Sequence, residues 1–134
     1  MNYSKKEKLS LLSDMIELAK SDNNLKDREF NFILAVANTL QISENEVSEL
    51  IEKPAEKVVF QSDTQRILHF HRLVLVMNID ERTSLVEITA LKNFGLHLGL
   101  PAEAIDEVFI RMNNYSNKVI PPNDFIEIFK RFYN

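Results

Sequence analysis

The sequence contains no cysteine and only two glycines in its 134 residues. Without cysteine the chain has no disulfide, no thiolate zinc site and no thiol nucleophile, and it suits a reducing compartment. Two glycines are too few for a glycine-rich phosphate-binding loop and for the many turns of an all-β chain. These absences argue against an all-β chain and fit the cytoplasm, where we expect the protein to be.

The chain also lacks an excess of basic residues. Its 16 lysines and arginines face 20 aspartates and glutamates, which gives a net charge of −4 and does not favour nucleic acid as a partner. The most apolar segment, 67–79, is interrupted by His69, His71 and Arg72 and is shorter than the roughly 20 apolar residues that span a bilayer. The first ten residues contain no apolar run typical of a secretory signal. We therefore expect no nucleic-acid partner and no integral membrane segment, while peripheral membrane association stays open.

One polar stretch, which runs from Asp22 to Glu29, occurs twice. A shift of 58 residues carries Asp22 onto Asp80 and Glu29 onto Glu87, since 80 − 22 and 87 − 29 are both 58. The same shift pairs apolar residues with apolar residues, for example Leu12 with Phe70, Met15 with Leu73, Ile33 with Leu91 and Val47 with Ile105. Such self-similarity predicts one helical unit used twice, at about 4–53 and 62–111, within a single domain of residues 1–134.

Capping residues and apolar stripes in the sequence predict where the helices begin and end. Ser4 with Glu7 and Ser43 with Glu46 have the form of capping boxes, and the first helix should end near Lys20. Its apolar stripe leaves Ser10, Ser13, Asp14 and Glu17 on the other side, which we interpret as the polar face. The second helix, about 27–40, is apolar on most sides and is expected at the centre of the bundle. Gly99 should cap the fifth helix in a left-handed conformation, a place that Gln41 takes in the first unit.

Two further segments lie outside this pattern. The apolar patch Val58-Val59-Phe60 is expected to be a linker pressed onto the core. Pro121-Pro122 precede a last helix, about 122–133, whose stripe runs from Phe125 to Tyr133. We expect this stripe to pack across the two units and close the core, rather than to dock on a partner or a membrane. The predicted fold is all-α, with about seven helices: two pseudo-repeated three-helix units and a C-terminal helix.

The residues around the repeated loop resemble the TerB-like family, named after tellurite-resistance protein B. The resemblance lies in Ala19-Lys20-Ser21-Asp22 through Glu29 to Leu40-Gln41-Ile42-Ser43, and again in Met77-Asn78-Ile79-Asp80 through Glu87 to Leu98-Gly99-Leu100-Pro101. Asn23 and Glu81 stand where the family usually has glycine after the aspartate. The resemblance implies a seven-helix domain with pseudo-twofold halves, tied to tellurite and stress resistance. It also implies a binding or scaffold role through protein partners, an acidic metal-binding patch in some members, and no established catalysis.

Asp22, Glu29, Asp80 and Glu87 are the candidate metal ligands. Each aspartate follows the negative end of a helix, where a carboxylate is disfavoured unless a cation neutralises it or N–H groups donate hydrogen bonds to it. A divalent cation is one way to stabilise the carboxylate. The other is capping by the backbone N–H groups of the loop, with each glutamate as the third residue of the next helix. We favour the capping interpretation. The loop is not an EF-hand, because Lys26, Asp27 and Ile33 stand where that motif needs an oxygen ligand, a glycine and the closing glutamate.

The histidines and the acidic helix faces do not predict a metal site or a catalytic site. His69 and His71 are two residues apart on one helix and point about 200° apart, so they cannot hold one metal ion; we expect one in the core and one in solvent. Acidic residues on the third and sixth expected helices, such as Glu49 and Glu103, form a solvated face or a docking surface for a basic partner. No nucleophile–base pair is visible. We expect a non-catalytic binding or scaffold protein without a cofactor, with a divalent-cation-binding or sensing domain as the alternative.

Overall fold

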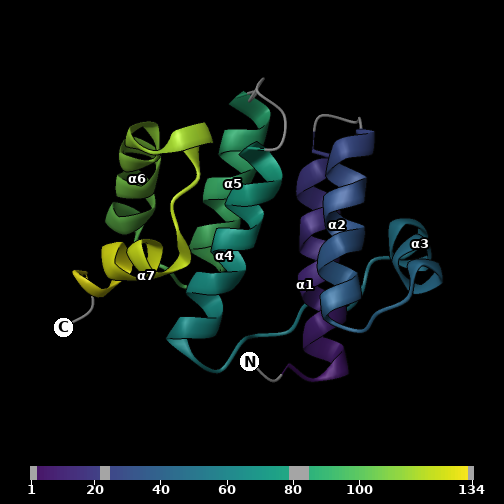
Figure 1. Cartoon of the computed structure of the whole chain (residues 1–134). Coiled ribbons are helices and arrows are strands. Elements are labelled where there is room, and N and C mark those ends of the chain that lie inside the picture. The colour runs from purple at the N-terminus through teal and green to yellow at the C-terminus, as the bar shows by residue number, and fades with distance from the viewer. Residues whose placement is uncertain (1–2, 22–24, 79–84, 133–134) are drawn as a thin grey trace.

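The computed structural model describes residues 3–21, 25–78 and 85–132. Over these ranges the chain forms seven α-helices, two short 3₁₀ turns and no β-strand (Figure 1). The helices are α1 (Lys5–Ala19), α2 (Asp27–Thr39), α3 (Glu44–Glu52), α4 (Asp63–Asn78), α5 (Leu85–His97), α6 (Ala102–Arg111) and α7 (Pro122–Lys130), with the 3₁₀ turns Met112–Asn114 and Ser116–Lys118 before α7. The predicted all-α class is confirmed.

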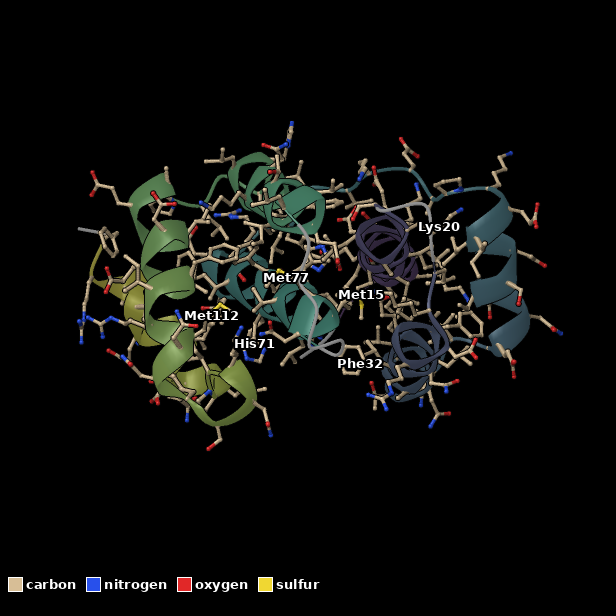
Figure 2. The ribbon with its side chains drawn as sticks, turned by 90° about the horizontal axis from the view of Figure 1, so that it is seen from above. Met15, Lys20, Phe32, His71, Met77 and Met112 are labelled. Atoms are coloured by element: carbon tan, nitrogen blue, oxygen red, sulfur yellow. The ribbon has the colours of Figure 1, made fainter. Side chains whose placement is uncertain are left out.

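Helices α1 and α4 form the centre of the molecule. Nine of the 15 residues of α1 and eight of the 16 residues of α4 are buried, and the two helices pack against each other. Figure 2 shows Met15 on the side of α1 that faces α4 and α5. The prediction that the second helix is central was wrong, because α2 buries only Glu29, Ile33 and Ala37. Most of its other apolar residues are only half-buried. Helix α2 contacts α1, α3 and α4, whereas α1 contacts α2, α3, α4 and α5.

The predicted caps are confirmed. In the first box the Ser4 N–H donates to Glu7 Oε1 at 2.8 Å and the Glu7 N–H donates to Ser4 Oγ at 3.1 Å, and Ser43 and Glu46 repeat the arrangement before α3. Gln41 and Gly99 take left-handed φ angles of +62° and +82° after α2 and α5. Both ends form the same motif, in which the following N–H reaches back five residues, from Ile42 to the Ala37 carbonyl at 2.9 Å and from Leu100 to the Gly95 carbonyl at 3.1 Å.

The spacing of 58 residues also carries helix bounds onto helix bounds. Adding 58 to the first residues of α1, α2 and α3 gives 63, 85 and 102, which are the first residues of α4, α5 and α6. The packing of the third helices differs, however: α3 lies on α1 and α2, whereas α6 lies on α5 and α7. The two units therefore share the spacing of their helix starts but not the packing of the third helix, and the prediction of one unit used twice is not confirmed.

Helix α7 takes the place on α4 that α3 takes on α1. Phe125, Ile128 and Phe129 are buried against α4 and α6, so the expected core role of this helix is confirmed. Its main contacts are both with helices of the second unit, and the expectation that it packs across the two units was wrong. Because α6 stands away from α4, the apolar face of α4 needs this extra helix as its cover. Among the described helices, none is long and apolar enough to cross a membrane.

Candidate functional site

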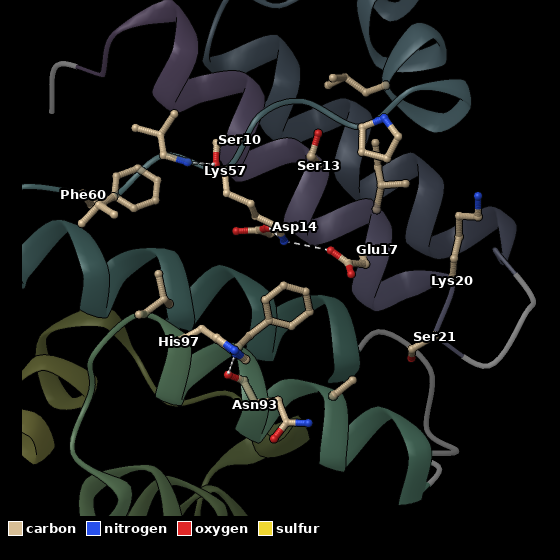
Figure 3. Close-up of a pocket in the computed structure, with 18 of the residues that line it drawn as sticks. Ser10, Ser13, Asp14, Glu17, Lys20, Ser21, Lys57, Phe60, Asn93 and His97 are labelled. Carbon is tan, nitrogen blue, oxygen red and sulfur yellow. Dashed lines mark hydrogen bonds and ion pairs between the residues drawn. The ribbon is translucent and has the colours of Figure 1, made fainter.

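A pocket of about 820 Å³ opens between α1, α5 and the segment 54–60, within the described part of the chain (Figure 3). That volume is in the range of small-molecule sites, about 300–1,000 Å³. Its wall is mostly apolar and is built by Ile16, Leu50, Ile51, Val58, Phe94 and Leu98, among others. The lining residues come from α1, the end of α3, the segment 54–60, here called the strap, and helices α4 and α5.

Polar contacts fix the strap to α1. Ser13 Oγ accepts the Ala55 N–H at 2.9 Å, and Ser10 Oγ accepts the Val58 N–H at 3.1 Å. Phe60 then enters the core with 1% of its surface exposed and packs on the His69 ring, with the ring centroids 5.0 Å apart. The expected linker pressed onto the core is thus confirmed for Phe60, whereas its neighbour Val59 is 80% exposed.

A buried carboxylate joins the strap to both central helices. Asp14 Oδ1 accepts from Lys57 Nζ at 2.7 Å, and Asp14 Oδ2 accepts from His69 Nε2 at 2.9 Å, so this nitrogen of His69 carries the proton. Lys57 Nζ also donates to Glu17 Oε2 at 2.9 Å. Burial alone would raise the pKa of Asp14, but the hydrogen bonds and charges of His69 and Lys57 outweigh it and lower that pKa below its ordinary value.

The pKa of Lys57 shifts in the opposite direction. Burial would lower the pKa of its ammonium group, but the hydrogen bonds and charges of Asp14 and Glu17 outweigh burial and raise it. The same ammonium lies 5.0 Å from the centroid of the Phe94 ring, on the α5 wall. Asp14 and Glu17 therefore share the single positive charge of Lys57 at one side of the pocket.

Other polar groups of the pocket wall keep free hydrogen-bonding capacity. Lys20 makes no ion pair with any described residue, and the hydroxyl oxygen of Ser21 is buried without a hydrogen-bond partner. On the opposite wall, His97 Nδ1 donates to the Asn93 carbonyl at 2.8 Å, which leaves its Nε2 as an acceptor (Figure 3). Free polar groups in a mostly apolar hollow are the usual composition of a ligand site.

Comparison with known proteins bears on the α1 wall of this pocket. The family model described as "Tellurite resistance protein TerB" matches residues 1–51. The match supports a TerB-like family assignment. No curated protein and no solved structure matches the chain. The matched residues contain α1, α2 and α3 up to Ile51, so the TerB-like segment supplies the α1 side of the pocket, and the strap and α5 lie outside it.

The predicted metal ligands are only partly described. Asp22 and Asp80 lie outside the described residues, so the structure does not place them. Glu29 and Glu87 are the third residues of α2 and α5, each is 2% exposed, and each has interaction partners. Neither of these glutamates lines the pocket, and within the described ranges no three histidine, aspartate or glutamate side chains come together at metal-binding distance.

The expectation that one of His69 and His71 faces solvent was wrong, because both are buried, with 0% and 7% exposure. They turn to separate partners as predicted: His69 meets Asp14, and His71 Nε2 donates to the Ile120 carbonyl at 2.7 Å. Burial, helped by the charge of Arg72, lowers the pKa of His71 despite the hydrogen bond to Ile120. Neither imidazole faces the pocket, and both are core residues.

The polar face assigned to the first helix was also wrong for three of its four residues. Ser10, Ser13 and Asp14 are buried, with 2%, 5% and 5% exposure, and only Glu17 is exposed. The reason is tertiary: the strap and α4 cover this face and bring donors that pair with it. Lys57, a lone cation beside the apolar patch 58–60, is the one sequence signal that could have pointed to a carboxylate partner in the core.

Proposed function

We propose that this TerB-like chain is a cytoplasmic, non-catalytic binding protein that works through a protein partner, with the pocket between α1 and α5 as its binding site. One observation carries the proposal: the wall of this pocket is mostly apolar, and two titratable groups in it, Asp14 and Lys57, are engaged with each other. A reaction centre needs an acid, a base or a nucleophile free to act on substrate. A binding site needs apolar area and a few free polar groups.

The partner contact is proposed at the mouth of this pocket. Val59 lies in its wall and is 80% exposed, which makes it the most exposed apolar side chain of the strap. A protein that covered Val59 would bury apolar area at the rim while leaving the deeper wall for a smaller ligand. Since apolar burial contributes roughly 25 cal/mol per Å², one exposed valine is a measurable part of such a contact.

Retention of partners on immobilised full-length protein tests the proposal. Wild-type protein, Val59→Glu and Ile110→Glu are compared on the same cell extract; Ile110 is 64% exposed on α6, outside the pocket, and is the matched control. We expect one protein that binds wild type and Ile110→Glu in equal amounts and is lost, at least tenfold, with Val59→Glu. A partner that Val59→Glu retains fully would exclude the pocket mouth as its docking site.

A second candidate, a divalent-cation-binding or sensing role, keeps support from Glu29 and Glu87. Both carboxylates are buried at the same place in their helices, directly after the two acidic loops. Buried carboxylates are rare unless paired, and both have partners in the protein already. A cation shared with Asp22 or Asp80 would add to those interactions rather than supply a missing one.

Calorimetric titration with calcium, magnesium and zinc tests the cation role. Binding that is present in wild type and absent from Asp22→Ala/Asp80→Ala would support it. If none of the three metals gives a heat of binding at millimolar concentration, the cation role is excluded. The pocket proposal is tested separately, with Val59→Glu, and does not rest on this titration.

A further inference from the structure

Lys57 presents one hydrogen-bond donor to which no described residue is bonded. A lysine ammonium group has three N–H groups. One donates to Asp14 Oδ1 at 2.7 Å and a second donates to Glu17 Oε2 at 2.9 Å, and Figure 3 shows the ammonium between these two carboxylates. No oxygen or nitrogen of the described residues accepts the third. The two carboxylates hold the ammonium in place, so the third N–H is a positioned donor in the pocket wall.

The charges around this donor disfavour an anionic ligand. Asp14 and Glu17 contribute two negative charges and Lys57 contributes one positive charge, so the group as a whole is negative. A carboxylate or phosphate that accepted the third N–H would lie beside both carboxylates and be repelled by them. The other cations of the wall do not offset this, because Arg66 is already in an ion pair and Figure 3 shows Lys20 apart from Lys57 and Glu17.

A cationic ligand is disfavoured for a different reason. The face of an aromatic ring attracts cations, but the ammonium of Lys57 already lies 5.0 Å from the centroid of the Phe94 ring. A ligand ammonium at this ring would be repelled by Lys57, and the carboxylates nearby already accept hydrogen bonds from Lys57. An uncharged acceptor, such as a carbonyl oxygen, can take the third N–H without either repulsion.

We propose that the pocket binds a small uncharged molecule with an apolar body and a carbonyl oxygen, and that this oxygen accepts the third N–H of Lys57. The apolar body lies along the wall formed by Ile16, Ile51, Phe94 and Leu98. This inference rests on the proposed role of the pocket as the binding site and names the class of ligand. Lys57 is the residue that selects the polar end of the ligand.

NMR titration of the isotope-labelled full-length protein tests the ligand class. Four probes share a phenyl ring on a short chain and differ at the polar end. They are benzylacetone, a ketone; 3-phenylpropanoate, a carboxylate; 4-phenylbutan-2-amine in its ammonium form; and butylbenzene, which has no acceptor. We expect benzylacetone to bind wild type at least tenfold more tightly than the carboxylate and at least threefold more tightly than the ammonium, with the largest changes in chemical shift at the pocket wall.

Lys57→Met tests the donor, because methionine keeps a long apolar side chain and has no N–H group. Binding of benzylacetone should weaken at least threefold, while the affinity for butylbenzene stays within about twofold of wild type. Lys53→Met is the matched control, since Lys53 is an exposed lysine outside the pocket, and it should leave all four affinities unchanged. Thermal unfolding verifies that each variant is folded.

Glu17→Gln tests the role of charge. Glutamine keeps an amide oxygen that can accept from Lys57, and Glu17 is 63% exposed, so the change is mild for the fold. It removes one of the two negative charges beside the donor. The preference of the pocket for benzylacetone over 3-phenylpropanoate should therefore fall at least threefold, measured at low ionic strength, where the charges are least screened.

Four results would overturn the proposal. They are no binding of benzylacetone at millimolar concentration, equal or tighter binding of either charged probe by wild type, an unchanged affinity for benzylacetone in folded Lys57→Met, and an unchanged preference in Glu17→Gln. The last result decides the matter if Lys57→Met does not fold. Because the partner assay with Val59→Glu needs no small ligand, it can succeed when this titration fails. Failure of both experiments would remove the pocket itself as the binding site.

Discussion

Replacing Asp14 by alanine is the sharpest test of how the molecule is held together. The carboxylate accepts hydrogen bonds from two segments far away in sequence, His69 on α4 and Lys57 on the strap, while its own side chain is 8% exposed. The alanine variant removes both acceptors and leaves a small void. We expect the free energy of unfolding to fall by about 2–4 kcal/mol, a large part of the roughly 5–15 kcal/mol of a typical domain.

The loss comes mainly from His69. Its side chain is fully buried, and its Nδ1 already has no hydrogen-bond partner, so without Asp14 both ring nitrogens are buried and unpaired. A hydrogen bond to a charged group contributes about 1.5–3 kcal/mol, and a stranded buried donor costs about 1–3 kcal/mol. Lys57 adds little, because its side chain is 65% exposed, it keeps Glu17, and such an exposed pair is worth about 0–1 kcal/mol.

Urea unfolding followed by circular dichroism at pH 7 measures these values. Glu17→Ala is the control, since Glu17 accepts from the same lysine but is 63% exposed; its effect should stay below about 1 kcal/mol. Lys57→Met should also cost less than Asp14→Ala. If Asp14→Ala and Glu17→Ala unfold within about 0.5 kcal/mol of each other, then His69 does not depend on Asp14, and the reasoning is wrong.

The same carboxylate predicts how stability changes in acid. The His69 and Lys57 interactions lower the pKa of Asp14 in the folded protein, so the unfolded chain binds a proton first. The stabilisation by the charged form is fully present above the unfolded pKa, near 3.9, and is lost as the pH falls through the lower folded pKa. The difference in unfolding free energy between wild type and Asp14→Asn should therefore be constant above about pH 5 and shrink below about pH 4.

Other positions give predictions of the same kind. Burial lowers the pKa of His71, so stability should fall as the pH drops below about 6.5, and His71→Gln should remove that part of the slope in unfolding measured at pH 7 and pH 5. Gln41→Gly should stabilise by about 0.5–1 kcal/mol in urea unfolding, because its φ of +62° is costly for a side chain, and Gly99→Ala should destabilise by a similar amount. Phe125→Ala should cost about 3–5 kcal/mol because the ring is fully buried, whereas an equal effect from the half-buried Phe132→Ala would contradict the core role of α7.

Helices and their ends could be predicted because their causes are local. The hydroxyl of Ser4 and the carboxylate of Glu7 are three residues apart, and the left-handed turn at Gly99 needs only the residues around it. The repeat strengthened the prediction of the helices and their ends, because the same signals occur in both units. The sequence therefore predicted the seven helices, their order and most of their bounds.

The pocket could not be predicted, because its walls come from segments that meet only in the fold. Asp14 pairs with Lys57 and with His69, which are 43 and 55 residues further along the chain. Periodicity divides a helix into apolar and polar faces, and it assigned Asp14 to the outer face because the residue is polar. Whether a polar face is exposed or satisfied inside depends on which donors the rest of the chain brings to it, and no local pattern carries that information.

The buried pair of Asp14 and His69 also explains why α1 and α4 meet in one register. Both helices present apolar stripes, and apolar side chains alone tolerate several packings of similar energy. A shift of one helical turn, about 5.4 Å, would move Asp14 out of reach of His69 and leave a carboxylate and an imidazole buried and unpaired. The correct register is the one in which both are satisfied. The strap is anchored to α1 through Ser10, one turn before Asp14, and through Ser13, directly before it. The register of α1 on α4 therefore also sets the shape of the pocket.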